Sequence, residues 1–208
     1  MTSPSKTRTP NGVSSNEGIR EQLIAVATSL FAQRGFHGTS MTEIENAVGR
    51  RRGTIYYHID SKADLLAEIC DRSTQDMVAA ARRIAAKQQN AREALFGMVD
   101  LHVREILTHT DRMAVVMRDL RSLPGPDLRR IAKRRDEYEE IWVGILNQGA
   151  AGGQWRSVDS FDVKSILGMI NYSILWLRPD GTLSTAEVVD RFVSLIEHGL
   201  GLPSQSEE

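Results

Sequence analysis

The sequence predicts an all-α protein of about nine helices, and three observations support this prediction. Apolar residues recur at helical spacing along most of the 208 residues, whereas the two-residue alternation of β-strands is missing. Capping patterns, in which Ser, Asn or Asp precedes an acidic residue by three positions, stand before several of these stretches. Glycine or proline follows most of them. We therefore expect a small amino-terminal bundle and a larger carboxy-terminal one.

The first helix is expected from about Glu17 to Arg34, with Asn16 as its cap and Gly35 as its stop. One apolar stripe supports it, made of Ile19, Leu23, Val26, Ala27, Leu30 and Phe31.

Two short helices should follow around a glycine turn. Ser40 and Glu43 form a capping box for the first, Gly49 allows the sharp turn, and the second should run from Arg52 to His58. Because nucleating a helix is costly, neither would persist without packing on the helices before and after.

Six more helices are expected, separated by Gly and Pro breaks. The predicted segments are Ser61 past Ile84, Asn90 to about Leu107, Asp111 to about Leu123, the stretch after Pro124-Gly125-Pro126 to about Ala151, a helix capped by Asp159 or Ser160 that ends before Pro179-Asp180-Gly181, and Ser184 to about His198.

Composition favours a soluble cytoplasmic protein. The single cysteine, Cys70, excludes an internal disulfide and a Cys-rich metal site. The longest apolar stretch, Ile166 to Leu177, is too short and too polar to span a bilayer, so no membrane partner is expected. Residues 1–16 have the Ser, Thr, Pro and Gly content of a disordered tail.

The net charge of −1 hides a division along the chain. Residues 1–62 carry eight Lys and Arg against five Asp and Glu, a charge of +3, and the remainder carries −4. A positive end on an acidic body is compatible with nucleic-acid binding.

The helix that begins at Arg52 has the composition of a DNA-reading helix. Its first residues, Arg52, Gly53 and Thr54, would reach the base edges of a major groove, and arginine matches the two acceptors of guanine. Phosphate-binding groups surround this tip: Tyr57, His58, Lys62, Thr39 and Ser40.

A solvated arginine turn beside core tyrosines is the alternative. The capped helix, the glycine turn and the aromatic-His-Ser-Lys sequence around Arg50 to Arg52 favour DNA binding. Tyr56 is expected to be half core, with its hydroxyl near DNA.

Residues 17 to 69 resemble the TetR family of transcriptional regulators. The resemblance rests on Gly35 and Phe36, Thr39 and Ser40, Ile44, Gly49, Gly53 to His58, and Ser61 to Leu65. It implies a homodimeric, all-helical repressor with a ligand pocket in its carboxy-terminal domain, in which the last two helices of each chain form a four-helix interface. It also implies base contacts from Arg52 and Thr54 and backbone contacts from Thr39, Tyr56, Tyr57, His58 and Lys62. The full predicted DNA-binding set is Thr39, Ser40, Arg51, Arg52, Gly53, Thr54, Tyr56, Tyr57, His58 and Lys62.

Three positions depart from the family pattern. Glu45 replaces a common alanine, Arg50 a valine and Arg51 a capping serine. We therefore expect the reading helix to lack a side-chain cap, and we expect Glu45 to pair with Arg50 or Arg51.

Independent support for a dimer comes from two helices that are apolar around most of their circumference. The residues are Ile166, Leu167, Ile170, Ile174, Leu175 and Leu177 on one, and Val188, Val189, Phe192, Val193, Leu195 and Ile196 on the next. Burial within a monomer is the alternative.

A ligand pocket is predicted from aromatic and methionine residues of the carboxy-terminal helices, which adapt well to apolar ligands. The set is Phe96, Met98, Met113, Met117, Trp142, Met169, Tyr172, Trp176 and Arg178, and a simple core is the alternative. The segments 141–149, 153–156 and 176–181 are similar to TetR-type repressors of sterol and fatty-acid breakdown, which implies an acyl-CoA or other lipid-like effector.

No metal, cofactor or enzyme motif is found, since the chain has no phosphate-binding glycine loop, no nucleophile elbow and no HExxH. We predict a DNA-binding regulator, a repressor released from a palindromic operator by a lipid-like or acyl-CoA ligand. Another hydrophobic effector and a non-specific architectural DNA-binding protein are the alternatives. The predicted divisions are a tail (1–16), a helix-turn-helix domain (17–64), a ligand-binding and dimerisation domain (65–201) and a flexible end (202–208).

Overall fold

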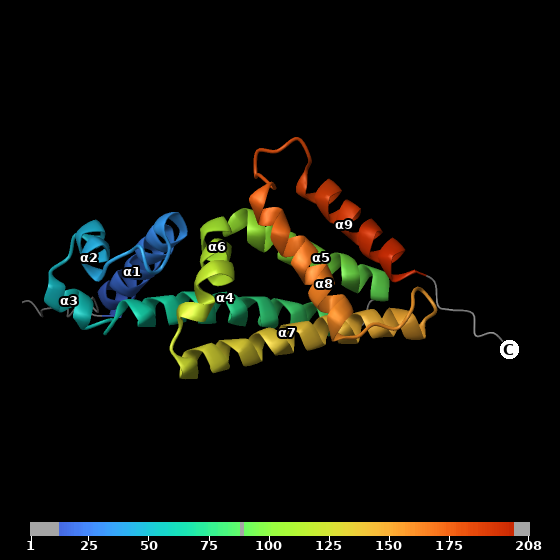
Figure 1. Ribbon diagram of the computed structural model, residues 1–208, viewed down its shortest axis with the longest axis horizontal. Helices are drawn as coiled ribbons and strands as arrows, with labels where there is room; N and C mark the ends of the chain where they lie inside the picture. Colours follow the sequence, from blue (N-terminus) through green and yellow to red (C-terminus); the bar gives the residue numbers. More distant parts are fainter. Residues whose placement is uncertain (1–12, 88–89, 202–208) are drawn as a thin grey trace, which may run out of the picture.

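The computed structural model describes residues 13–87 and 90–201, and in these ranges the fold is all-α with no strand (Figure 1). The helices are α1 Val13–Arg34, α2 Met41–Val48, α3 Arg52–Tyr56, α4 Lys62–Ala85, α5 Ala91–Thr108, α6 Thr110–Asp119, α7 Gly125–Ala151, α8 Ser160–Tyr172 and α9 Thr185–Leu200. Short 3-10 turns, Leu120–Ser122 and Ser173–Leu175, extend α6 and α8. Within these ranges no helix combines the length and apolarity that crossing a bilayer requires.

The predicted helix boundaries hold best where a side chain caps the helix. Ser61, Asn90, Asp159 and Ser184 each accept a hydrogen bond from the backbone N–H three residues on, so these four helices begin where the sequence indicates. Between the two candidates for the cap of α8, Asp159 takes the position.

Three expected boundaries differ. Helix α1 begins at Val13, so Asn16 lies inside it; the sequence between them contains no Gly or Pro that would stop a helix. Helix α3 ends at Tyr56 and excludes His58. The turn after α6 is 3-10 rather than α. Of the predicted tails, residues 1–12 and 202–208 lie outside the described residues.

Two hydrophobic cores divide the molecule. The first, which we call the head core, joins α1, α2 and α3 with the first half of α4. It also contains four residues from much later in the sequence, Val115, Leu120, Leu123 and Ile131. The head core therefore continues past residue 64, where the sequence pattern placed a domain boundary.

The second, the body core, fills the space between α5, α7, α8, α9 and the second half of α4. Helix α4 leads from the head into the body, α7 packs along it, and α9 lies on α5 (Figure 1). Because α4 contributes to both cores, the head and the body share one continuous helix.

The loop after α7 closes the body through Trp155, which is 2% exposed. Its indole N–H donates to the Leu146 carbonyl at 2.7 Å. Its ring covers Gly149, where a Cβ would stand 2.1 Å from ring carbon Cζ2. Gly149 is thus fixed by a close approach rather than by backbone conformation.

Replacing Gly149 with alanine should therefore destabilise the protein by about 1–3 kcal/mol, because the ring must shift out of a packed site. The matched control is Gly144→Ala on the same helix, where a Cβ meets nothing within 4 Å. That change should stabilise by about 0.5–1 kcal/mol, since alanine is the better helix former. Urea unfolding of both variants tests the pair, and equal effects of the same sign would contradict this account.

Candidate nucleic-acid interface and cavity

The α2–turn–α3 unit is built by local bonds. The Ser40 hydroxyl accepts from the Glu43 N–H, and the Glu43 carboxylate accepts from the Ser40 N–H at 2.7 Å, which completes the predicted capping box. Gly49 adopts φ +67°, a left-handed conformation that suits glycine, and its N–H donates to the Glu45 carbonyl. Arg51 caps α3 without a side-chain hydrogen bond, as its replacement of a capping serine predicted.

Arg52 stands at the tip of α3 with its side chain 75% exposed. Two neighbours orient it: Glu45 on α2, 3.7 Å from Arg52 Nε, and Tyr56, whose hydroxyl accepts from Arg52 Nη2 at 3.4 Å. The Tyr56 hydrogen bond, followed by the charge of Glu45, raises the pKa of the guanidinium. The expected pairing of Glu45 with Arg50 or Arg51 is therefore wrong; the first residue inside the helix is the one that faces α2.

The other predicted DNA-binding side chains are mostly open to solvent around this tip. Tyr57 is 76% exposed, Tyr56 is 36% exposed, and Ser40, Arg51 and Gly53 are also exposed. Thr54 and His58 are half-buried. Their shared surface contains hydroxyl, imidazole and guanidinium donors, as a phosphate-binding rim requires.

Two residues predicted to contact phosphates, Thr39 and Lys62, make hydrogen bonds inside the head. Thr39 is 1% exposed, and its hydroxyl donates to the Gly35 carbonyl at 2.9 Å, so it is not placed to reach DNA. The Lys62 ammonium donates to the carbonyls of Phe36 (2.7 Å) and Thr39 (2.6 Å) and lies over the Phe36 ring. An ammonium has three hydrogens, so Lys62 keeps one for a phosphate.

Helix α6 is bonded to the head at the end of α1. The Arg118 guanidinium donates to the carbonyls of Phe31 and Ala32, in the last turn of α1. The carboxylate of Asp119, itself 5% exposed, accepts from the Phe36 N–H at 3.3 Å and from Arg118 Nη2 at 2.9 Å. Adjacent residues of α6 thereby bond backbone groups in the last turn of α1 and in the turn that follows it, although the Phe31 carbonyl also accepts the Gly35 N–H at 2.8 Å.

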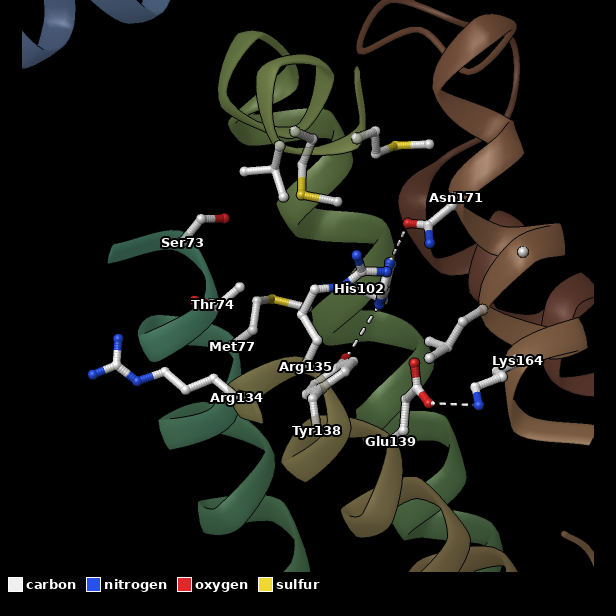
Figure 2. A pocket seen from close by; sticks show the side chains of 15 residues that line it. Ser73, Thr74, Met77, His102, Arg134, Arg135, Tyr138, Glu139, Lys164 and Asn171 are labelled. Atoms are coloured by element: carbon white, nitrogen blue, oxygen red, sulfur yellow. Dashed lines mark hydrogen bonds and ion pairs between the residues drawn. The ribbon is translucent and has the colours of Figure 1, made fainter. Parts of the chain in front are cut away.

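A cavity of about 440 Å³ opens on the other face of α6 (Figure 2). Five helices line it: α4 with Ser73, Thr74 and Met77; α5 with His102; α6 with Met113, Val116 and Met117; α7 with Arg134, Arg135, Tyr138 and Glu139; and α8 with Lys164, Leu167, Gly168 and Asn171.

Three of the lining residues, Tyr138, His102 and Asn171, are joined by hydrogen bonds, and we call them the polar chain (Figure 2). His102 Nε2 lies 2.8 Å from Asn171 Oδ1, and His102 Nδ1 lies 3.2 Å from the Tyr138 hydroxyl. Burial lowers the pKa of His102, opposed by the Asn171 hydrogen bond and the charge of Glu105. Burial likewise raises the pKa of Tyr138. The neutral imidazole has one N–H, and because Asn171 Oδ1 only accepts, that N–H is on Nε2 and the tyrosine donates to Nδ1.

Most of the predicted pocket residues lie elsewhere. Met113 and Met117 line the cavity, whereas Met98 and Trp142 are fully buried in the body core and Phe96 packs against it. Met169, Tyr172, Trp176 and Arg178 are exposed on the outer surface. Apolar periodicity identifies an inward face but not which helix it meets. The polar chain was missed, although a histidine flanked by Val99, Val103 and Ile106 was a usable signal.

The exposed apolar residues of α8, α9 and the turn between them are not the ones expected. Of the twelve residues proposed from the pattern, nine are buried in the chain's own core, Ile174 is half-buried, and Leu175 and Leu195 are exposed. The large apolar side chains that are exposed here, which we call the apolar set, come from α8, the turn after it and α9: Phe161, Met169, Tyr172, Leu175, Trp176 and Leu195.

Comparison with known proteins assigns both parts of the chain. Residues 23–69 match the family described as "Bacterial regulatory proteins, tetR family", and residues 88–200 match "Tetracyclin repressor-like, C-terminal domain". The HTH-type transcriptional repressor KstR2 of Rhodococcus jostii (strain RHA1) is 27% identical over 195 residues, covering 91% of this chain and 95% of the relative.

Solved structures share the whole arrangement. The ketosteroid transcriptional regulator KstR2 of Mycobacterium tuberculosis has a TM-score of 0.79 at 25% identity, covering 88% of this chain and 94% of that one. AibR, in complex with isovaleryl coenzyme A and operator DNA, has the same fold with a TM-score of 0.76 at 23% identity, covering 85% and 97% of the two chains.

The buried histidine predicts a pH dependence of stability. In the unfolded chain His102 takes up a proton near its ordinary pKa of 6.5, whereas the folded protein keeps it neutral to lower pH. The unfolded state then binds more protons, so the free energy of unfolding should fall as pH is lowered below about 6.5. His102→Gln should flatten this fall in urea unfolding between about pH 8 and pH 5.5. The comparison at pH 8, where the wild-type imidazole is neutral, isolates the cost of lost hydrogen bonds. An unchanged slope in the variant would contradict the assignment.

Proposed function

The chain belongs to the TetR family of bacterial regulators and is a transcriptional repressor of that type, not an enzyme; from this premise we propose how it binds DNA and is released. In this proposal a homodimer binds a palindromic operator through its two α3 helices. A lipid-like or acyl-CoA effector then enters the cavity beside α6 and releases the operator.

The observation that carries the proposal is the double role of α6. Met113, Val116 and Met117 line the cavity, while Val115 belongs to the head core and Arg118 and Asp119 hold the end of α1. A ligand that shifts this helix must also shift the head. Release requires only that the effector bind one spacing of the two heads better than the other.

Operator reading is assigned to the exposed tip of α3. Arg52 and Thr54 would contact bases, and Tyr57, His58 and Lys62 would contact phosphates. In a symmetric dimer the two tips must lie roughly 34–36 Å apart to enter successive major grooves.

The dimer is assigned to the apolar set of α8, the turn after it and α9. Side chains as large as Trp176 (53% exposed) and Tyr172 (65% exposed) are unusual on a surface that meets only water. A second copy related by twofold symmetry would cover the same residues on both chains.

The effector class rests on the cavity and on the relatives. The cavity falls within the range of small-molecule sites, and three methionines make its wall adaptable. The ketosteroid transcriptional regulator KstR2 and AibR, which was solved with isovaleryl coenzyme A, share this fold, which makes lipid-like acids and their CoA thioesters the first compounds to test.

Arg52→Ala should weaken operator binding by roughly tenfold or more and relax base preference, because a guanidinium reads two guanine acceptors at once. Binding to random DNA should weaken less. Arg83→Ala is the matched control, since this exposed arginine lies at the far end of α4. Fluorescence anisotropy with operator and scrambled duplexes measures both. Equal losses of affinity for the two duplexes would contradict base reading by Arg52. In a footprinting experiment, protection spread uniformly along the DNA would favour a non-specific architectural protein.

Coupling through α6 gives a second prediction. A panel of fatty acids, steroid acids and their CoA thioesters should contain a compound that raises the melting temperature and lowers operator affinity about 5- to 150-fold. Arg118→Ala should bind that compound as the wild type does but retain more of its operator affinity, because the α6 clamp on α1 is gone. If only another class of compound releases DNA, the effector class is wrong. If Arg118→Ala is released as readily as the wild type, the route through α6 is wrong.

A further inference from the structure

We propose that the cavity selects an amphipathic organic anion and that Arg135 of α7 binds its negative group; this inference rests on the proposed role of the cavity as the effector site. It assigns a chemical class to the effector and a recognition residue to the site.

The charges that line the cavity do not cancel. Arg134 is paired with Asp71 on α4, and Lys164 lies 3.7 Å from the Glu139 carboxylate. Arg135 has no carboxylate within 4.0 Å among the residues that the structure describes. Its side chain extends from α7 toward the middle of the lining side chains (Figure 2). One guanidinium is therefore left over, and a guanidinium binds carboxylates and phosphates through two parallel hydrogen bonds.

The neighbouring polar groups also favour an acceptor. The neutral His102 uses its N–H on Asn171 Oδ1, which turns the Asn171 amide nitrogen away from the imidazole. In the described part of the chain no acceptor takes a hydrogen bond from that nitrogen. Arg135 and Asn171 both offer donors, so a ligand with acceptor oxygens satisfies them, whereas a cationic ligand meets a net charge of the wrong sign.

Part of the wall is apolar. Met77 from α4, Met113 and Met117 from α6 and Leu167 from α8 line the same cavity as the polar chain. Such a wall suits a hydrocarbon body, and the cavity of about 440 Å³ holds that body with one charged group.

Two kinds of ligand carry this chemistry. A free acid carries its charge at the end of its apolar chain, and a CoA thioester carries it on the phosphates of its CoA part. Both place an acyl chain against the methionines and an anionic oxygen against Arg135.

A pair of fluorescent probes tests the inference without knowledge of the natural effector. Anilinonaphthalene sulfonate is an amphipathic anion, and N-phenylnaphthylamine has the same rings without the charge. Wild-type protein should bind both. Arg135→Gln should weaken binding of the sulfonate roughly tenfold and leave binding of the neutral probe unchanged, because glutamine keeps polarity but loses the charge. Arg129→Gln makes the same exchange on α7 outside the cavity lining and should affect neither probe.

Competition then identifies the source of the charge. Dodecanoate, dodecanoyl-CoA and methyl dodecanoate share one chain, so displacement of the sulfonate by the acid places the anion on the body. Displacement by the thioester alone places it on the phosphates. Either result supports the inference, whereas equal displacement by the neutral ester, or a sulfonate affinity that Arg135→Gln leaves intact, would overturn it.

If Arg135→Gln had no effect on sulfonate binding, that result would not bear on operator binding, because no DNA is present in these titrations. Conversely, failure to bind an operator would overturn the proposed function and leave the probe measurements standing. The two failures are therefore distinguishable.

Discussion

Backbone groups at the end of helix α1 and just after it are bonded by two side chains of α6, Arg118 and Asp119. The position of α6 relative to the head depends on these bonds. A helix that stops at Arg34 leaves its last carbonyls without intrahelical donors. Arg118 bonds the Ala32 carbonyl and also the Phe31 carbonyl, which accepts the Gly35 N–H as well, and Asp119 accepts the Phe36 N–H from 83 residues away. A buried N–H without an acceptor would cost about 1–3 kcal/mol, so the head is complete only with α6 in place.

This requirement makes α6 a shared wall rather than a linker. One face of the helix closes the head core with Val115, and another presents Met113 and Met117 to the cavity. Packed interfaces of this kind respond to a ligand by switching between arrangements, because close-packed side chains cannot deform smoothly. In the proposed mechanism, contacts already present would couple effector to operator, and α4, which belongs to both cores, would transmit the same shift.

The sequence predicts local features well and non-local ones poorly, for a physical reason. Capping boxes such as Ser184 with Glu187 depend on residues within four positions of each other. The turn at Gly49 depends on one residue that adopts a positive φ without strain. The lining of the cavity depends on which helix faces which, so Trp142, which was predicted as a pocket residue, lies in the core, while His102, which was not among the predicted pocket residues, lines the cavity. Lys62 shows the same limit: its charge suggests a phosphate, and only the fold reveals that two carbonyls take it first.

The same distinction separates the residues that build the reading surface from those that can read. Thr39 is held by a short hydrogen bond to a carbonyl and Lys62 by two, so withdrawing either from these carbonyls would break the turn that positions α2, and only the third ammonium hydrogen of Lys62 is left for a phosphate. Arg52 is held by a 3.7 Å ion pair and a 3.4 Å hydrogen bond, both at the surface, where such contacts are weak. If Arg52 reads a base as proposed, exchanging these contacts for a guanine edge would cost little, and Glu45 and Tyr56 would orient the guanidinium in the absence of DNA. The lack of a side-chain cap on α3 is therefore compatible with base recognition by Arg52, because Glu45 of α2 and Tyr56, one turn further along α3, orient its guanidinium.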